Sequence, residues 1–356
     1  GEQWKVMGMA PYGKKNEQLF NDFSNWIFTD GIELKSRQTN YHIILRNNIT
    51  ANKYENLNKY DLAFTAQLFF EETILKLLRA CYAKWPNENL IFSGGCALNS
   101  AANGKIHTST SYKNVFIPSA PADDGCAVGA ALLTFKKFNS TKKIPYHQTN
   151  PYLGFEIKED ELQNFLSFSG YQFKKINYPE IYQTVATHIL DGKIIAWVQG
   201  NSEFGPRSLG NRSILANPCL ANMKDIINSK VKFREEFRPF APAILEEFAN
   251  EYFEDYFPTP YMERVLKIKK DKQSLIPAVT HIDGTGRLQT VNKKDNLHFY
   301  SLIYEFNKIS KIPVILNTSL NVMGKPIISS VSDIASVFAT SGIDILVIND
   351  YVISKK

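Results

Sequence analysis

Apolar and polar residues follow two periods along the chain, and together they predict helices alternating with short strands. In residues 61–85 apolar side chains recur at helical spacing until Pro86 ends the pattern. Short apolar runs that end in glycine, proline or small polar residues predict strands at 89–95, 114–118, 193–199, 312–316 and 343–348. Further helices are predicted near Asn99 and at 125–136, 158–168, 181–191 and 332–340, the last capped by Ser332. This alternation is typical of an α/β fold.

A polar stretch divides the chain into two parts. Residues 136–152 are rich in lysine, asparagine and threonine and contain two prolines, which is the composition of a linker. The length of 356 residues also exceeds one ordinary core. We therefore expect one domain over residues 1–145 and a second over residues 151–356.

Composition narrows the class of protein. The chain is 44% hydrophobic and has no apolar run of the roughly 20 residues that a membrane helix requires. It shows no secretory signal, and its four cysteines form no Cys-x-x-Cys pair, so we expect a reducing, cytoplasmic setting. The net charge of +6 is dispersed and forms no continuous basic stripe, which disfavours nucleic acid as a partner.

Two arginine-rich segments stand out in the second part. The segments are 203–213 and 232–242, and they place charged residues among glycines, prolines and phenylalanines. Guanidinium groups match phosphate and carboxylate oxygens, so the pattern predicts a pocket for a compact, highly anionic ligand. The alternative is a set of structural ion pairs that use Glu203, Glu235 and Glu236. The candidate ligand-binding residues are Arg207, Arg212, Lys232, Arg234 and Arg238.

Four weaker motifs also carry candidate chemistry. Gly94 and Gly95 end a predicted strand and could expose backbone N–H groups to a phosphate, although a simple turn explains them as well. The Asp123–Asp124 pair could hold a metal or cap a helix, and capping is the better explanation. A polar segment with His281 could supply a proton donor, or form only a hydrogen-bonded turn. The remaining candidates are Arg287 in that segment, and Asn317, Thr318 and Ser319 after a predicted strand.

Seven motifs in a fixed order resemble those of the O-carbamoyltransferases that modify nodulation factors, cephamycins and aminoglycoside antibiotics. The motifs lie at 5–13, 93–99, 121–131, 203–213, 232–242, 281–291 and 316–321, and the resemblance covers nearly the whole chain. It implies the C-terminal part of an actin/Hsp70-like ATPase-fold lobe, similar to the tRNA threonylcarbamoyladenosine transferases. A YrdC/Sua5-like α/β domain follows.

The resemblance also implies a reaction. In the YrdC-like domain, ATP with Mg²⁺ and carbamoyl phosphate would form carbamoyl-adenylate and release pyrophosphate. The first domain would then transfer the carbamoyl group to a hydroxyl of a small-molecule or saccharide acceptor, beside iron or another divalent metal. No motif identifies the acceptor.

The resemblance assigns residues as well. Gly94, Gly95 and Asn99 would contact nucleotide, and Asp123, or alternatively Asp124, would bind the metal. The basic set Arg207, Arg212, Lys232, Arg234 and Arg238 would hold carbamoyl phosphate and the phosphates of ATP. The remaining motifs of that domain would contribute His281, Arg287, Asn317, Thr318 and Ser319.

One departure from the family concerns the first domain. Members begin well upstream of the motif at residues 5–13, and that upstream part carries two histidine metal ligands. We therefore expect the sequence to be a fragment, or a partner chain to supply the missing lobe. Two other hypotheses about function stay open. The protein could be a YrdC/Sua5-like tRNA-modifying or RNA-binding protein, or a non-catalytic nucleotide-binding subunit.

Overall fold

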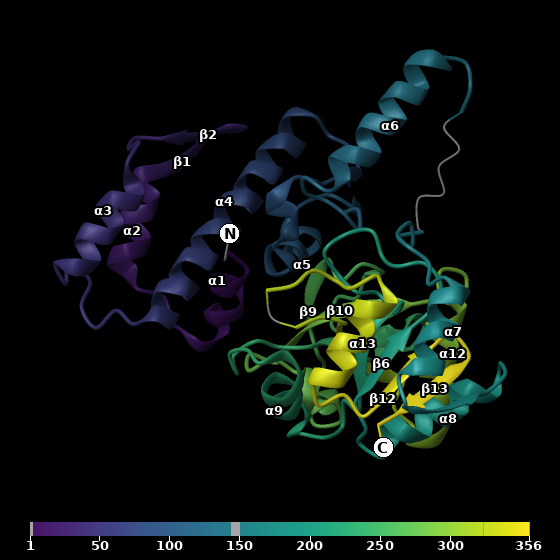
Figure 1. Cartoon of the computed structure of the whole chain (residues 1–356). Helices are drawn as coiled ribbons and strands as arrows, with labels where there is room; N and C mark the ends of the chain where they lie inside the picture. The colour runs from purple at the N-terminus through teal and green to yellow at the C-terminus, as the bar shows by residue number, and fades with distance from the viewer. Residues whose placement is uncertain (1–2, 144–149, 323, 356) are drawn as a thin grey trace. The chain divides into compact units, whose positions relative to one another are not determined.

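The chain forms two compact units in the computed structural model, which describes residues 3–143, 150–322 and 324–355 (Figure 1). Unit 1 contains Gly1–Phe92, Asn99–Ile117 and His281–Asp283. Unit 2 contains Ser93–Leu98, Pro118–Thr280 and Gly284–Lys356. The predicted domain boundary lies between residues 145 and 151, and residues 144–149 lie outside the described residues.

Unit 1 is mainly helical, and its longest element is the predicted amphipathic helix, observed as α4. Asn58 caps this helix, since its side-chain oxygen accepts hydrogen bonds from the N–H groups of Tyr60 and Asp61 at 2.8 and 3.0 Å. The helices are α1 (Gln3–Met9), η1 (Ala10–Tyr12), α2 (Glu17–Trp26), α3 (Tyr41–Thr50), α4 (Lys59–Lys84) and α5 (Ser100–Ser109). The strands are the antiparallel pair β1 (Ile27–Asp30) and β2 (Glu33–Ser36) and the parallel pair β3 (Asn89–Ile91) and β4 (Asn114–Phe116).

Unit 2 contains a nine-stranded mixed sheet in the order β5-β13-β12-β6-β7-β11-β8-β10-β9. The strands are β5 (Gln172–Lys175), β6 (Ile195–Val198), β7 (Arg212–Ala216), β8 (Ala241–Leu245), β9 (Arg264–Lys267), β10 (Thr285–Val291), β11 (Val314–Ser319), β12 (Ile345–Ile348) and β13 (Tyr351–Ser354). Strand β11 lies between β7 and β8 and runs antiparallel to both, whereas β10 runs parallel to β8. The order of strands in space therefore differs greatly from their order in the chain.

Unit 2 also contains helices and short turns. They are η2 (Gly95–Leu98), α6 (Gly125–Phe138), α7 (Glu159–Phe168), α8 (Glu180–Leu190), α9 (Met223–Ile227), η3 (Asn228–Lys232), η4 (Glu246–Phe248), α10 (Ala249–Tyr252), α11 (Lys270–Gln273), η5 (Pro277–Val279), α12 (Leu297–Ser310) and α13 (Val331–Thr340). Among the described residues no helix is long and apolar enough to cross a membrane.

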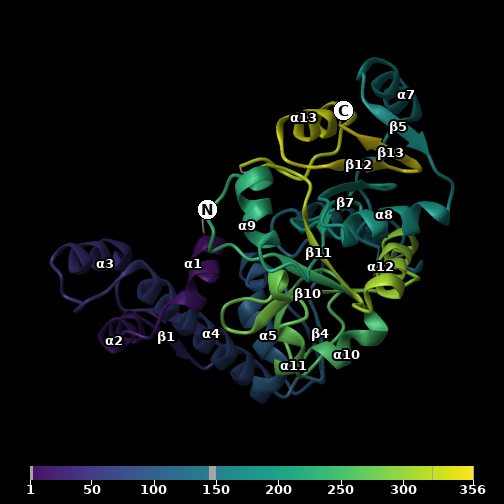
Figure 2. The ribbon, with the colours of Figure 1, turned by 90° about the horizontal axis from the view of Figure 1, so that it is seen from below.

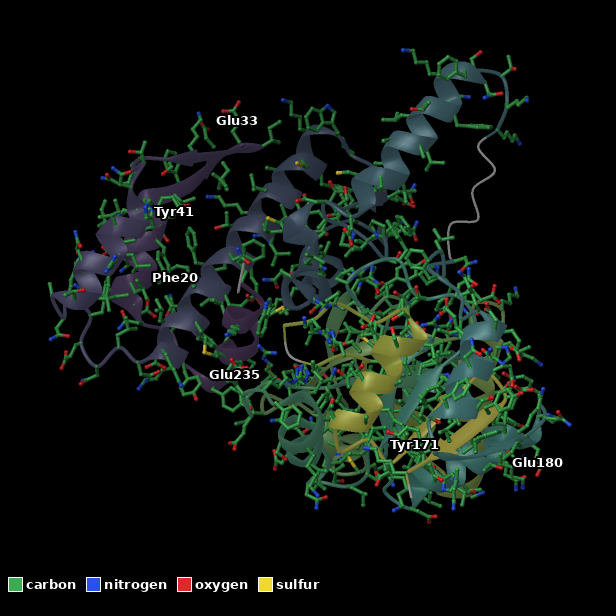
Figure 3. The ribbon with its side chains drawn as sticks, in the orientation of Figure 1. Phe20, Glu33, Tyr41, Tyr171, Glu180 and Glu235 are labelled. Carbon is green, nitrogen blue, oxygen red and sulfur yellow. The ribbon has the colours of Figure 1, made fainter. Side chains whose placement is uncertain are left out.

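Successive side chains of the central strands point to opposite faces of the sheet and pack into two separate hydrophobic cores. Ile195 and Trp197 of β6 pack with α8 and α12, which lie side by side on one face (Figure 2). Ala196 and Val198 point to the other face and pack with residues of α7, α9 and α13. On that face the ring of Tyr171, which Figure 3 labels, meets the ring of Phe338 edge-on, with the ring centroids 5.1 Å apart. Burial on both faces explains why these strands are almost continuously apolar.

The predicted helices and strands are confirmed, with one correction. The cap of α13 is Ser330 and not Ser332, because the Ser330 hydroxyl accepts the N–H of Asp333 at 3.1 Å and the helix begins at Val331. Strands β1, β2, β5, β7, β8, β9, β10 and β13 were not predicted. The mixed α/β class is confirmed, while the actin/Hsp70-like and YrdC-like arrangements remain predictions.

Candidate functional site

The sheet register of unit 2 brings the arginine-rich segments to one end of the sheet. Asn317 of β11 lies opposite Ala241, the first residue of β8, and Ser319 lies opposite Ser213 near the start of β7. In β10, Gln289 lies opposite Ala243, so Arg287 is level with the start of β8. The segments that precede β7 and β8 therefore meet the start of β10 and the end of β11.

Five cations gather at this end and perturb one another. Burial lowers the pKa of Arg287 far below its usual value, and the charges of Arg207 and Arg234 lower it further. Lys232 is 2% exposed, and its pKa is lowered by burial and then by Arg234 and Arg238. Burial and then Arg238 lower the pKa of Arg234 to about 10, and burial lowers that of Arg207. We call Arg207, Lys232, Arg234, Arg238 and Arg287 the cation cluster.

Such a cluster costs free energy when it is empty, because like charges are held together away from water. Glu235, which Figure 3 labels, offsets part of this charge, since its Oε2 atom pairs with Arg238 Nε at 2.9 Å. For Arg234, burial and Arg238 outweigh the opposing influence of Glu235. A multivalent anion would relieve the repulsion and accept charge-assisted hydrogen bonds from several guanidinium groups.

Arg212 is fully buried, and its guanidinium group supports the first arginine segment from inside. Nη1 donates to the carbonyl oxygens of Gln199 and Asn211 at 3.0 and 2.9 Å. Nη2 donates to those of Phe155 and Gly200 at 2.8 and 2.9 Å. Through these contacts Arg212 holds the backbone of the loop in place. It is not a member of the cation cluster.

Glu203 organises the same loop, but it does so through backbone contacts. Its Oε1 atom accepts the N–H groups of Leu209, Asn211 and Arg212 at 2.6, 2.8 and 3.2 Å. Arg238 and Glu235 thus form an ion pair of the kind that the structural hypothesis predicted. Glu203 instead accepts hydrogen bonds from backbone N–H groups. Gly210 closes the loop at φ +109°, and a Cβ atom there would lie 2.3 Å from the Phe299 ring.

The second segment is anchored through Lys232 and Arg234. Lys232 Nζ donates to the Ser319 carbonyl oxygen, to the Asn321 carbonyl at 3.1 Å and to Asn321 Oδ1 at 2.8 Å. Arg234 Nε donates to Asn228 Oδ1 at 2.8 Å, and its guanidinium group lies 4.6 Å from the centre of the Phe240 ring. Lys232 therefore links this segment to the end of β11.

The polar residues at the end of β11 differ in their accessibility. Asn317 is fully buried and donates to the Ser208 carbonyl oxygen at 3.2 Å and to Gln289 Oε1 at 2.8 Å. Thr318 and Ser319 are partly exposed. Asn317 thus ties the Arg207 loop to β10 and β11, while Thr318 and Ser319 retain surface for a ligand.

The glycine turn of residues 94–95 is exposed and lies in unit 2. Gly94 adopts φ +97°, and its N–H donates to the Pro121 carbonyl oxygen at 2.6 Å. Asn99 belongs to unit 1, where its Oδ1 accepts the N–H of Ala102 and caps α5. The Asn99 and Gln67 amides also exchange hydrogen bonds at 2.9 and 3.0 Å. The side chain of Asn99 is therefore used in local structure.

Among the described residues, the predicted metal position has no supporting set of ligands. Asp123 is exposed in a turn, and Asp124 Oδ1 accepts the N–H of Gly125 at 3.1 Å at the start of α6. Within the described ranges no three His, Cys, Asp or Glu side chains are grouped to hold a metal ion. Asp123 and Asp124 therefore do not form a metal centre by themselves, and metal binding by either residue stays a prediction. His281 is partly buried and belongs to unit 1, whereas Arg287 belongs to unit 2.

Several polar residues of this end were not predicted as part of the site. Asn228, Gln289 and Asn321 position members of the cation cluster or the Arg207 loop through hydrogen bonds. Asn228 accepts a hydrogen bond from Arg234 six residues away, whereas the partners of Gln289 and Asn321, Leu209 and Lys232, are distant in the sequence. Gln289 and Asn321 lie inside the motifs at 281–291 and 316–321, and Asn228 lies outside all seven motifs.

The lowered pKa of Lys232 predicts how the free energy of unfolding changes with pH. Because its folded pKa lies well below the ordinary 10.5, the native state binds fewer protons than the unfolded state between these two values. The free energy of unfolding of the wild-type chain should therefore rise with pH over the range below 10.5, relative to a Lys232→Met variant. The slope should be at most about 1.4 kcal/mol per pH unit.

Urea denaturation of both proteins at a series of pH values measures this difference. Saturating pyrophosphate should flatten the wild-type slope, because a bound anion favours the ammonium form. A difference that does not change with pH would contradict a buried Lys232 beside Arg234 and Arg238.

The sequence matches two parts of one protein family. The carbamoyltransferase N-terminus matches residues 1–132, and the carbamoyltransferase C-terminus matches residues 186–355. The chain belongs to the carbamoyltransferase family.

Its relatives include nodulation proteins. Nodulation protein NolNO of Sinorhizobium fredii is 35% identical, covering 100% of this chain and 53% of that protein. Nodulation protein NolO of Bradyrhizobium diazoefficiens is 36% identical, covering 100% of this chain and 66% of that protein. The chain therefore spans between half and two thirds of the length of these relatives.

Similarity to solved structures is weaker. Full-length HypF in its phosphate- and nucleotide-bound form has a TM-score of 0.31 and 16% identity, covering 59% of this chain and 28% of that one. HypF of T. kodakarensis has a TM-score of 0.33 and 15% identity, covering 67% of this chain and 34% of that one. These values are too low to support an argument about mechanism.

Proposed function

We propose that unit 2 binds carbamoyl phosphate and the phosphates of ATP on the cation cluster and forms carbamoyl-adenylate there. The observation that carries this proposal is the position of Arg287, whose pKa is lowered first by burial and then by the charges of Arg207 and Arg234. Guanidinium groups from three separate segments thus lie near one another away from water. Two anionic reactants can be joined only where their charges are neutralised, and a preformed cationic site does this with little reorganisation.

The balance of atoms defines the proposed step. Phosphate leaves carbamoyl phosphate, with water consumed, and the resulting carbamate oxygen attacks the α-phosphorus of ATP. The bond from this phosphorus to the bridging oxygen breaks, and pyrophosphate leaves. Mg²⁺ would accompany ATP and share in neutralising the phosphates. The cation cluster would hold the two substrates in line and stabilise the charge on the departing pyrophosphate.

We further propose that the carbamoyl group passes to a hydroxyl of a small-molecule or saccharide acceptor. The hydroxyl oxygen attacks the carbamoyl carbon, AMP leaves, and the hydroxyl proton is lost to a base. Since Asp123 lacks a metal-binding set among the described residues, we assign no metal to this step. Membership of the carbamoyltransferase family supports the transfer itself.

Release of pyrophosphate tests the first step. The full chain is incubated with ATP, Mg²⁺ and carbamoyl phosphate, and pyrophosphate is measured by an enzyme-coupled assay. We expect release only when both substrates are present, and none when phosphate replaces carbamoyl phosphate. Absence of release both with this chain and with a chain extended to the length of its relatives would overturn the proposal.

A further inference from the structure

Phe233 has an unusual backbone in the middle of the cation cluster. It follows the π-helical turn η3 and adopts φ +50° and ψ +49°, the left-handed region. A bulky residue is rare there, because its Cβ approaches the following carbonyl oxygen. π-Helical turns and left-handed non-glycine residues both occur preferentially at functional sites.

The surrounding contacts hold this backbone in place. The N–H groups of Phe233 and Arg234 both donate to the Asn228 carbonyl oxygen, the second at 3.2 Å. The left-handed residue lets the side chains on both sides of it turn inward. Lys232 reaches the end of β11, and Arg234 reaches Asn228 and the Phe240 ring. Glycine or asparagine would adopt this conformation with less strain, so the fold alone does not require a phenyl ring.

The Phe233 ring itself is left at the surface. It is 54% exposed, although Lys232 beside it is 2% exposed. Within the part of the chain that the structure describes, the ring has no aromatic or cation–π partner. A flat apolar ring thus stands free between two residues of a site suited to phosphates. Any nucleotide base can stack on such a ring, because every base has a flat π-face.

We propose that Phe233 is the stacking surface for the base of the nucleotide whose phosphates lie on the cation cluster. This inference rests on the proposed function and adds the residue that recognises the base. It explains why a strained phenylalanine occupies a position that glycine would fill at lower cost.

The test compares ATP with tripolyphosphate, which has the same phosphate chain but no base. In Phe233→Asn the ring is removed while the residue still tolerates the left-handed backbone. We expect this variant to bind ATP about 5- to 150-fold more weakly and tripolyphosphate as the wild type does. Phe233→Trp should retain ATP binding. Isothermal titration calorimetry gives both affinities, and circular dichroism checks folding.

A matched control and defined outcomes separate the possible failures. Phe168→Asn removes an 87% exposed ring at the end of α7 and should leave both affinities unchanged. Equal losses for ATP and tripolyphosphate in Phe233→Asn, or no loss of ATP, would overturn the stacking role. If the wild type binds ATP and Arg287→Met weakens it, the proposed function stands even then. If the wild type binds neither anion, both proposals fall.

Discussion

Replacing Arg287 with methionine should lower the rate of pyrophosphate release by about 10²- to 10³-fold, the effect of removing one preorganised charge donor. The side chain of Arg287 lies at the start of β10, and its Nε atom has no hydrogen-bond partner among the described residues. Methionine keeps much of the apolar volume and removes a charge that Arg207 and Arg234 repel. The free energy of unfolding of the empty protein should therefore stay equal or rise.

This combination of lost turnover and retained stability distinguishes a ligand-binding arginine from a structural one. The matched control is Arg46→Ala, which removes one exposed guanidinium group from α3 and should leave pyrophosphate release unchanged. Initial rates and urea denaturation are measured on the same preparations. Unchanged turnover in Arg287→Met, or a loss of turnover that follows a loss of stability, would contradict a role in binding.

Replacing Arg212 with methionine should lower the free energy of unfolding, unlike the replacement of Arg287. Its guanidinium group donates to the carbonyl oxygens of Phe155, Gln199, Gly200 and Asn211. Methionine leaves these buried acceptors without their donor, and the free energy of unfolding should fall by about 3–5 kcal/mol. Urea denaturation at neutral pH measures the loss.

A conservative variant sharpens this prediction. Arg212→Lys keeps the charge but replaces a planar fork by a single ammonium group, which cannot reach four carbonyl oxygens in the same geometry. We expect it to recover less than half of the stability lost in Arg212→Met. A loss below about 1 kcal/mol in Arg212→Met would show that the loop does not depend on this frame.

The different surroundings of Arg207 and Arg212 could not be predicted from the sequence. Both arginines lie in one glycine-rich segment, and both were predicted to bind the anionic ligand. The structure places Arg207 with the cation cluster and Arg212 on backbone carbonyl oxygens. Backbone acceptors leave no trace in a sequence, so no pattern of residue types could have separated the two environments.

The fold was predictable where local signals are strong. The 26-residue helix α4 has a clear period and a following proline, and Asn99 was correctly placed at the start of α5. Strands β7, β8 and β10 were missed because they begin inside the motifs that we interpreted as ligand loops. Their partners are also distant in the sequence, and the pairing of β11 with β7 and β8 depends on tertiary contacts.

The central position of β11 has a consequence for how the site is made. Because this strand separates β7 from β8, the segments that carry Arg207 and Lys232 have no common support until residues near 319 are in place. During synthesis the arginine segments emerge about a hundred residues before the strand that joins them, a separation that makes the contact slow to form. The proposed nucleotide site is therefore completed in one late, cooperative event, and the amide protons of β11 should exchange with solvent only when the whole sheet opens.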